Sequence, residues 1–129
     1  MQKHSPLDYC EVTPSAAITP AAHGWRAKCL QRLVRLDLPV PMTVALPTQT
    51  VRAIAAGHTL DTRAILAHFG DAPLISVRPS PENPDWGGPG TVLNVGMNAD
   101  RHAALVARHG QEAADALYLR FVQSYATHV

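Results

Sequence analysis

The chain has 129 residues, 47% of them hydrophobic and 16% charged, and its formal net charge at pH 7 is +1. The length is typical of one domain, and the apolar fraction suffices for a buried core. The balanced charge, without a basic cluster, disfavours a nucleic-acid partner. No stretch approaches the ~18 apolar residues that span a bilayer, and no apolar signal sequence follows Met1. We therefore expect a cytoplasmic protein without a membrane partner.

Residues 1–22 are rich in Pro, Ser, Thr and Ala and are predicted to be irregular, with a possible short strand at 9–12. An amphipathic helix is predicted to begin at about Gly24 and to end before Pro39, with Gln31 among its polar positions. The apolar stripe of this helix, expected to face the core, consists of Trp25, Cys29, Leu30, Leu33, Val34 and Leu36. Both cysteines, Cys10 and Cys29, are expected to be reduced thiols.

Short elements alternate through the middle of the chain. Strands are predicted at 42–46, 74–78 and 91–95, and short helices at 48–56 and 60–69. A helix capped by Asn98 or Asp100 is expected to end at His109, with Gly110 as its terminator. The last helix carries an apolar stripe that consists of Ala114, Leu117, Tyr118, Phe121, Val122 and Tyr125. The predicted class is α+β (mixed α/β), with one small sheet backed by helices.

Several short motifs occur in a characteristic order. Residues 24–30 read Gly-Trp-Arg-Ala-Lys-Cys-Leu and lead into Leu-Pro-Val-Pro at 38–41. Residues 76–78 read Ser-Val-Arg, residues 91–98 read Thr-Val-Leu-Asn-Val-Gly-Met-Asn, and residues 120–125 read Arg-Phe-Val-Gln-Ser-Tyr. These motifs resemble those of the pyruvate phosphate dikinase family, which includes phosphoenolpyruvate synthases. The family reads Gly-Gly-Lys-Gly-Ala-Asn-Leu with Gly-Leu-Pro-Val-Pro, Ser-Val-Arg-Ser-Gly-Ala-Arg with Leu-Asn-Leu-Gly-Leu-Asn, and Arg-Phe-Ile-Gln-Met-Tyr.

The resemblance covers most of residues 24–129 and implies the first portion of an ATP-grasp nucleotide-binding domain. On this basis residues 1–22 are expected to be an irregular segment, and residues 23–129 a dikinase-like ATP-binding subdomain within a single domain. The implied ligand is a nucleotide, ATP with Mg²⁺ or ADP. The residues that the resemblance assigns to its binding are Arg26, Arg78, Gly87, Gly88 and Thr91.

Arg26 occupies the position of the family's phosphate-binding lysine, and Lys28 is the alternative cation. In the first turn of a helix, Arg26 is also expected to have free backbone N–H groups beside it. The Arg26 guanidinium can bind phosphate oxygens through two parallel hydrogen bonds, and Arg78 ends an apolar strand before a loop, a position where ligand contacts are common. The alternatives are that Arg26 lies on the solvated face of the helix, and that Arg78 pairs with Glu82 or Asp85.

The loop chemistry departs from the family. Its Met-Met-Asp is replaced by Gly-Pro-Gly at 88–90, and its Ser-Gly-Ala-Arg by Pro-Ser-Pro-Glu at 79–82. An acidic residue therefore stands where the family has a basic one. The second ATP-grasp lobe, the phosphohistidine domain and the pyruvate site are not recognised within these residues. We therefore expect no catalytic residue and no independent phosphotransferase activity.

Two other functions remain open. The chain could be a non-catalytic pseudoenzyme or interaction protein, forming a homodimer or binding a partner through apolar surface. It could also be one half of a split dikinase, completed by a dikinase-like partner chain. Among other residues, His102 and His109 lie seven apart on one helix and are predicted to be solvated instead of binding a metal. No Cys/His nucleophile arrangement is recognised.

Overall fold

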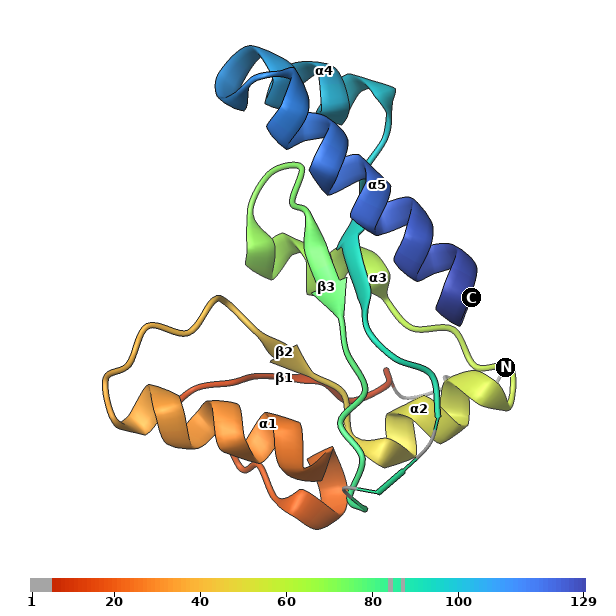
Figure 1. Ribbon diagram of the computed structural model, residues 1–129. Coiled ribbons are helices and arrows are strands. Elements are labelled where there is room, and N and C mark those ends of the chain that lie inside the picture. Colours follow the sequence, from red (N-terminus) through yellow and green to blue (C-terminus); the bar gives the residue numbers. More distant parts are fainter. Residues whose placement is uncertain (1–5, 84, 87) are drawn as a thin grey trace. The chain divides into compact units, whose positions relative to one another are not determined.

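The computed structural model describes residues 6–83, 85–86 and 88–129. The chain divides into two compact units, each of which is considered by itself (Figure 1). The first comprises residues 6–70, 80–83 and 85–86, and the second comprises residues 71–79 and 88–129. Helices and antiparallel strands occur in both units, so the predicted mixed α+β class is confirmed. The prediction of one sheet is wrong, because the described residues form two separate two-stranded sheets.

The first unit holds the short strands β1 (Cys10–Glu11) and β2 (Val44–Ala45), which pair antiparallel with Cys10 opposite Ala45. Its helices are α1 (Pro20–Arg35), α2 (Thr48–Ala55) and α3 (Thr62–Leu66), the last continued by a 3-10 helix at Ala67–Phe69. Side-chain caps begin two of these helices. The Thr19 hydroxyl accepts a hydrogen bond from the Ala22 N–H at 3.1 Å, and an Asp61 oxygen accepts one from the Ala64 N–H at 3.1 Å. Helix α1 begins at Pro20, earlier than the predicted start near Gly24, and the other elements of this unit lie close to their predicted positions.

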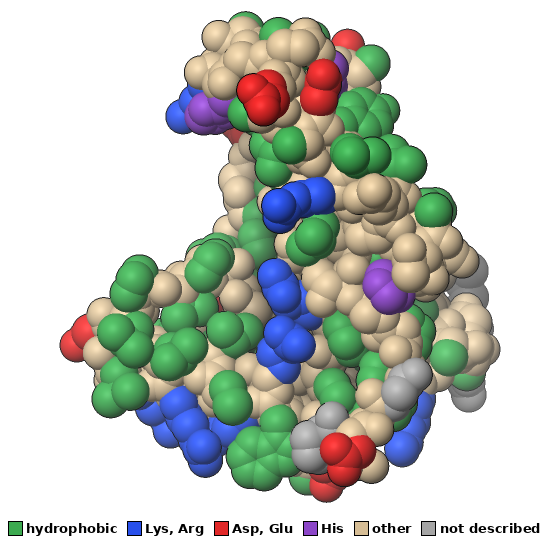
Figure 2. Space-filling model, viewed as in Figure 1, with side chains coloured by type: hydrophobic (Ala, Val, Ile, Leu, Met, Phe, Trp, Pro, Cys, Tyr) green, Lys and Arg blue, Asp and Glu red, His purple; other side chains and the backbone are tan. Residues whose placement is uncertain are grey.

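Helix α1 buries a different face from the predicted one. Ala27 and Gln31 are buried and Leu30 and Val34 half-buried, which is an i, i+3, i+4, i+7 stripe. Leu36 is 69% exposed, and Trp25 and Cys29 are also exposed. Figure 2 shows hydrophobic side chains gathered on the surface over α1 and the chain that follows it. Both stripes satisfy the helical period, so periodicity alone could not choose between them.

Contacts with the rest of the first unit determine which face of α1 is buried. The buried cluster that α1 joins contains Val12, Ile18, Ala27 and Ala45. Three of these residues come from the segments on either side of α1, and all four are aliphatic. Ala27 allows the helix to approach them closely, whereas the larger Trp25 would not fit against such a compact cluster. The expectation that Cys29 faces the core is therefore wrong.

The second unit is built from β3 (Ile75–Val77), β4 (Val92–Val95), α4 (Ala99–His109) and α5 (Gln111–His128). Helix α5 packs against both β4 and α4 (Figure 1). Asn98 caps α4 by accepting the Arg101 N–H at 2.9 Å, and Gly110, with φ of 93°, separates the two helices as predicted. Of the helices in the described part of the chain, none has the length and apolar character to cross a membrane.

Strand β4 contains an irregularity that ties it to α5. Ile75 lies opposite Val95 but Val77 lies opposite Val92, so β4 has one additional residue between the pairs. Within this stretch Asn94 has φ of 53°, a left-handed conformation that asparagine adopts more readily than most residues. The Asn94 side-chain amide donates to the Leu117 carbonyl at 3.0 Å, and the Leu93 N–H donates to the Ser124 hydroxyl at 3.0 Å. Side chain and backbone of β4 are thus both fixed by α5.

Candidate functional site

Two of the predicted nucleotide-binding residues lie together in the second unit. Arg78 directly follows β3 and Thr91 directly precedes β4. Because Val77 lies opposite Val92 in the antiparallel pair, Arg78 and Thr91 occupy the same end of the two strands. Arg78 is exposed and Thr91 is half-buried. The strand pairing therefore presents a guanidinium and a hydroxyl at one edge, a combination that suits an oxyanion.

Arg78 makes no ion pair with a carboxylate of the described part of its own unit. The carboxylates considered as alternative partners, Glu82 and Asp85, belong to the first unit, so that alternative stays open. An exposed guanidinium at the end of an apolar strand can donate several hydrogen bonds to a ligand. This geometry is compatible with the predicted role of Arg78.

The glycine-rich loop contributes less than the sequence suggested. Gly87 lies outside the described residues, and Gly88 is exposed. The amide of Gly90 is occupied, because it donates to Nδ1 of His128 at 3.0 Å. A Cβ at Gly90 would lie 2.6 Å from the His128 ring, so a larger residue there would require the ring to shift. One amide of the loop therefore serves to anchor it to the end of α5, and Gly88 remains as the described candidate.

Arg26 lies in the first unit, and the surroundings of its helix correct one expectation. Gly24 has φ of 77° and ψ of 169°, so the helical hydrogen bonds restart after it. The Trp25 N–H donates to the Pro81 carbonyl at 3.1 Å, and the Ala27 N–H donates to the Ser80 hydroxyl at 3.0 Å. The Ser80 hydroxyl in turn donates to the His23 carbonyl at 2.6 Å. Ser80 and Pro81 thus cap this helix start from a distant part of the sequence.

The predicted free backbone N–H groups beside Arg26 are therefore taken at Trp25 and Ala27. An anion at this helix start would have to displace the Ser80–Pro81 segment. The Arg26 side chain is exposed, so the remaining support for its role is its charge and the resemblance. Of the five predicted site residues, the structure brings together Arg78 and Thr91.

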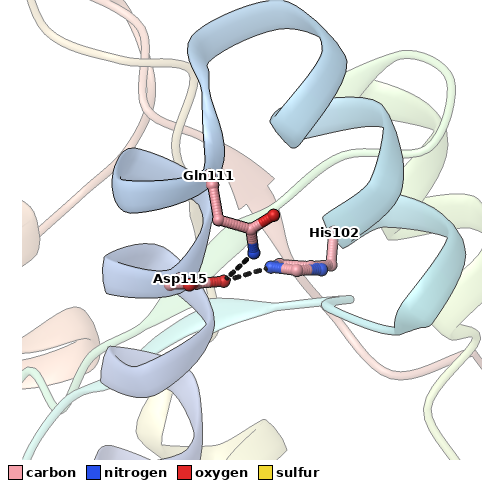
Figure 3. Close-up of polar contacts among 3 residues, drawn as sticks. All are labelled: His102, Gln111 and Asp115. Carbon is pink, nitrogen blue, oxygen red and sulfur yellow. Dashed lines mark hydrogen bonds and ion pairs between the residues drawn. The ribbon is translucent and has the colours of Figure 1, made fainter.

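A polar cluster that the sequence did not predict joins α4 to α5 (Figure 3). Asp115 accepts hydrogen bonds at one oxygen from Nε2 of His102 at 2.7 Å and from the Gln111 amide at 2.8 Å. The His102 bond, followed by the Gln111 bond, lowers the pKa of the Asp115 carboxyl below its ordinary value. The His102 ring also meets Tyr118 edge to face, with centroids 5.5 Å apart. The prediction that His102 is solvated is therefore wrong.

This cluster is better suited to stabilising the helix pair than to catalysis. A His–Asp pair can position an imidazole as a general base when the other ring nitrogen faces a nucleophile. Here the third residue of the cluster is Gln111, whose amide bonds to Asp115. An amide is neither a nucleophile nor an acid, so the cluster lacks a reactive group for His102 to activate. Gly110 terminates α4 and lets α5 return beside it, which brings residues before and after it into contact. The sequence predicted the turn at Gly110. A search for polar residues on either side of it that could contact each other would have identified His102 and Asp115.

In the first unit, Cys10 and His23 also form a contact that sequence reasoning missed, with Sγ 3.8 Å from Nε2. Burial raises the pKa of the Cys10 thiol, which keeps the sulfur protonated and weakly nucleophilic. Nδ1 of His23 accepts the Thr19 N–H at 3.4 Å, so a neutral ring carries its proton on Nε2 and directs it at the sulfur. A base would need a lone pair there. The contact therefore belongs to packing of the first unit.

No group of three or more His, Cys, Asp or Glu side chains in the described ranges is arranged to bind a metal ion. Comparison with protein-family models, with curated proteins and with solved structures found no match. The resemblance of residues 24–129 to the dikinase family therefore stays a prediction. The observations that bear on function are the strand-end pair Arg78 and Thr91 and the exposed apolar surface.

Proposed function

We propose that this chain is a nucleotide-binding module in which Arg78 contacts the phosphates of ATP or ADP. The observation that carries the proposal is that Arg78 and Thr91 flank the Val77–Val92 pair at one end of β3 and β4. The guanidinium supplies a planar donor fork, and the Thr91 hydroxyl can donate beside it. Exposure of Gly88 adds backbone that a phosphate can approach. The motif resemblance supplies the identity of the ligand.

The donor set fits phosphate better than it fits a metal ion. Arg78 and Thr91 offer hydrogen-bond donors, whereas Mg²⁺ requires oxygen ligands such as carboxylates. Any Mg²⁺ would therefore arrive with the nucleotide, coordinated by phosphate oxygens and water. The residues of this chain would bind and orient the phosphates, and the proposal includes no transfer of a phosphoryl group.

A titration with Mg-ATP and Mg-ADP, followed by calorimetry and by the melting temperature, tests the proposal. We expect millimolar nucleotide to raise the melting temperature, because a ligand that binds only the folded state stabilises it. Arg78→Ala should weaken binding by roughly tenfold or more, the equivalent of one charged hydrogen-bonding group at about 1.5–3 kcal/mol. Arg120→Ala, at another exposed arginine of the second unit, is the matched control and should leave binding unchanged.

Absence of a thermal shift and of binding heat at millimolar nucleotide would contradict the proposal. So would equal binding by the wild type and by Arg78→Ala. Arg26 enters the proposal through the resemblance alone, and the same titration of Arg26→Ala tests it separately. Unchanged affinity in that variant would remove Arg26 from the site and leave the role of Arg78 intact.

A second candidate function, as an interaction protein, is favoured by the outer face of α5. Leu119, Val122 and Tyr125 follow one another at three-residue spacing on this helix, and all three are exposed. Apolar side chains grouped on one helix face commonly mark a contact with another protein. A homodimer is the simplest form of this function, and a dikinase-like partner chain is the form that a split enzyme would take.

Sedimentation of the purified protein over a range of concentrations tests the homodimer. The apolar face predicts self-association that Val122→Lys abolishes, because the substitution places a charge in the centre of the row. Gln123→Lys adds the same charge at the adjacent exposed position and should not affect association. A monomer that persists at high concentration would exclude the homodimer and leave the partner chain as the remaining form.

A further inference from the structure

The second unit contains a small pocket that is separate from the strand end discussed above. It has a volume of 210 Å³ and lies between the chain preceding β3 and one face of α4. Its apolar lining consists of Ala72, Leu74, Ala104 and Leu105, and its charged lining consists of Arg101 and Arg108. The volume is below the roughly 300–1,000 Å³ of sites for drug-sized ligands, so a whole nucleotide would not fit.

The arrangement of the lining follows from the helical repeat of α4. Positions 101, 104, 105 and 108 are spaced i, i+3, i+4 and i+7, so they share one face of the helix. The face therefore presents an apolar centre with an arginine at each end. A ligand that contacts all of it needs an apolar part as well as a group that hydrogen-bonds to guanidinium.

The two arginines have no acidic partner in the described part of their unit. The ion pair that this unit forms there joins His102 to Asp115 and involves neither arginine. Asp100 precedes Arg101 but lies about 100° around the helix from it. Two arginines that line one pocket, neither of them in an ion pair within the described part of the unit, favour an anionic ligand there.

The position of Arg101 strengthens this argument. Arg108 lies in the last turn of α4, where a positive charge is favourable because the helix dipole is negative there. Arg101 lies in the first turn, where the dipole is positive and a cation is unfavourable. Stabilisation of α4 therefore accounts for Arg108 and leaves Arg101 unexplained, whereas an anion in the pocket accounts for both.

The wall opposite α4 has two unusual backbone features. Ala72 has φ of 51°, a left-handed conformation that residues with a Cβ rarely adopt, and such conformations concentrate at ligand sites. The neighbouring Pro73 carbonyl lies so close to Gly96 that a Cβ there would approach it to 2.7 Å. Gly96, with φ of 107°, thus allows the end of β4 to lie directly against the backbone of Pro73, between the lining residues Ala72 and Leu74.

We propose that this pocket binds a small amphiphilic anion, a carboxylate or phosphate group attached to a short apolar chain. The apolar chain contacts Leu74 and Leu105 at the centre of the face, and the anionic group lies at the rim, where the Arg101 and Arg108 side chains can donate hydrogen bonds to it. The site is independent of the nucleotide proposed for Arg78, because it uses different residues and has room only for a smaller molecule.

The test uses the full chain labelled with ¹⁵N and four probes: butyrate, butyl phosphate, inorganic phosphate and 1-butanol. We expect butyrate or butyl phosphate to shift the amide resonances of Ala104 and Leu105 saturably at millimolar concentration. The stronger of these two identifies the anionic group. Inorganic phosphate and 1-butanol, each with only one part of the ligand, should bind at least tenfold more weakly.

Matched variants separate the role of the charges from that of the pocket. Arg101→Gln and Arg108→Gln should each weaken binding at least tenfold, and Ala104→Phe should abolish it by filling the space. Arg120→Gln, an exposed arginine elsewhere in the unit, should bind as the wild type does. An unchanged pattern of amide resonances away from α4 verifies that each variant is folded.

Absence of shifts with both amphiphilic probes overturns the proposal. Equal binding of 1-butanol overturns the role of the charge, and equal binding of inorganic phosphate overturns the role of the apolar chain. Unchanged binding by both arginine variants also overturns it. A titration of Arg101→Gln with Mg-ATP separates this proposal from the nucleotide proposal. Because Arg101 is not part of the nucleotide site, the variant should bind Mg-ATP as the wild type does, whether or not the pocket binds an amphiphilic anion.

Discussion

Gln31 shows how one side chain organises the first unit. It is completely buried, and its amide donates to the carbonyls of Thr13 at 3.1 Å and Ala16 at 2.6 Å. Its oxygen accepts from Nζ of Lys28 at 2.9 Å, and Lys28 also donates to the Ile18 carbonyl at 3.0 Å. The side chain therefore fixes the turn before α1 to the middle of that helix. Buried polar groups are tolerated when satisfied in this way.

Replacing Gln31 by leucine should destabilise the protein despite the greater hydrophobicity of leucine. The substitution keeps the volume similar but removes hydrogen bonds from two carbonyls and one ammonium group. We expect a loss of about 1–3 kcal/mol in the free energy of unfolding, the cost of leaving buried polar groups unpaired. Urea denaturation measures it, with Gln49→Leu at an exposed position of α2 as the control. Equal stability of the two variants would contradict the role assigned to Gln31.

Gly24 is a residue of α1 that the backbone of Ser80 approaches closely. A Cβ at this position would lie 1.6 Å from the Ser80 carbonyl oxygen, in addition to the strain of a φ of 77°. Gly57 has a similar φ of 97° and no neighbouring atom within 4 Å of its Cβ position. Substituting alanine at Gly57 would introduce backbone strain alone, whereas the same substitution at Gly24 would add a steric clash.

Gly57→Ala should cost about 1–2 kcal/mol, the ordinary penalty of a left-handed residue with a Cβ. Gly24→Ala should cost more, because the clash is with backbone and can be relieved only by moving Ser80 away from the helix. Thermal denaturation compares the two, and hydrogen exchange at the Ala27 amide reports whether the Ser80 cap has been lost. Equal destabilisation with a protected Ala27 amide would show that the two backbones do not approach so closely.

At the scale of elements, the pairing of α4 and α5 rests on the cluster around Asp115. This carboxylate is exposed, so its effect on stability is modest and sensitive to solvent. The hydrogen bonds from His102 and Gln111 nevertheless lower its pKa in the folded protein. The folded state thus holds this proton less tightly than the unfolded state does, and the ionised carboxylate favours folding.

The pH dependence of stability follows from this direction. The contribution of Asp115 is complete above the ordinary carboxyl pKa of about 4 and disappears as the pH falls through the lowered pKa of the folded state. The urea midpoint of the wild type should therefore decline across this acidic range more than that of Asp115→Asn. Denaturation between about pH 2 and pH 6 provides the comparison. Parallel profiles for the two proteins would show that the hydrogen bonds seen in Figure 3 do not influence stability.

At the scale of the whole molecule, the chain forms two units that are interleaved in sequence. Residues 71–79 belong to the second unit, and residues 80–83 and 85–86 return to the first. The first unit is organised around Val12, Ile18, Ala27 and Ala45, and the second around the packing of α5 on β4. Each unit therefore has its own set of stabilising contacts.

Variants placed in the two units should lose hydrogen-exchange protection in different regions. Gln31→Leu should expose the amides of α1 first, whereas Asn94→Ala should expose those of β4 and α5, because Asn94 holds the bulge and bonds to Leu117. Hydrogen exchange with mass spectrometry resolves these regions, since local stability varies along a chain. Uniform loss of protection in both variants would indicate a single cooperative structure.

The sequence by itself determined the features that depend on near neighbours. Gly110 marked the end of α4 and Asn98 was one of two cap candidates for its start, because caps act through backbone groups only a few residues away. It also predicted that Arg78 ends a strand and Thr91 begins one, and in the structure each lies one residue outside β3 or β4. Their pairing across the β3–β4 end required the register, which the structure supplied.

The tertiary structure decided which face of α1 is buried, that Gln31 lies in the core, and that Ser80 caps the helix start at Ala27. Each of these depends on segments distant in sequence, whose approach is selected by the total packing and hydrogen bonding of the unit. The division into two sheets and the contact of Cys10 with His23 also depend on residues that are distant in sequence. Local patterns restrict each element to a few orientations with similar free energies, and the contacts between elements choose among them.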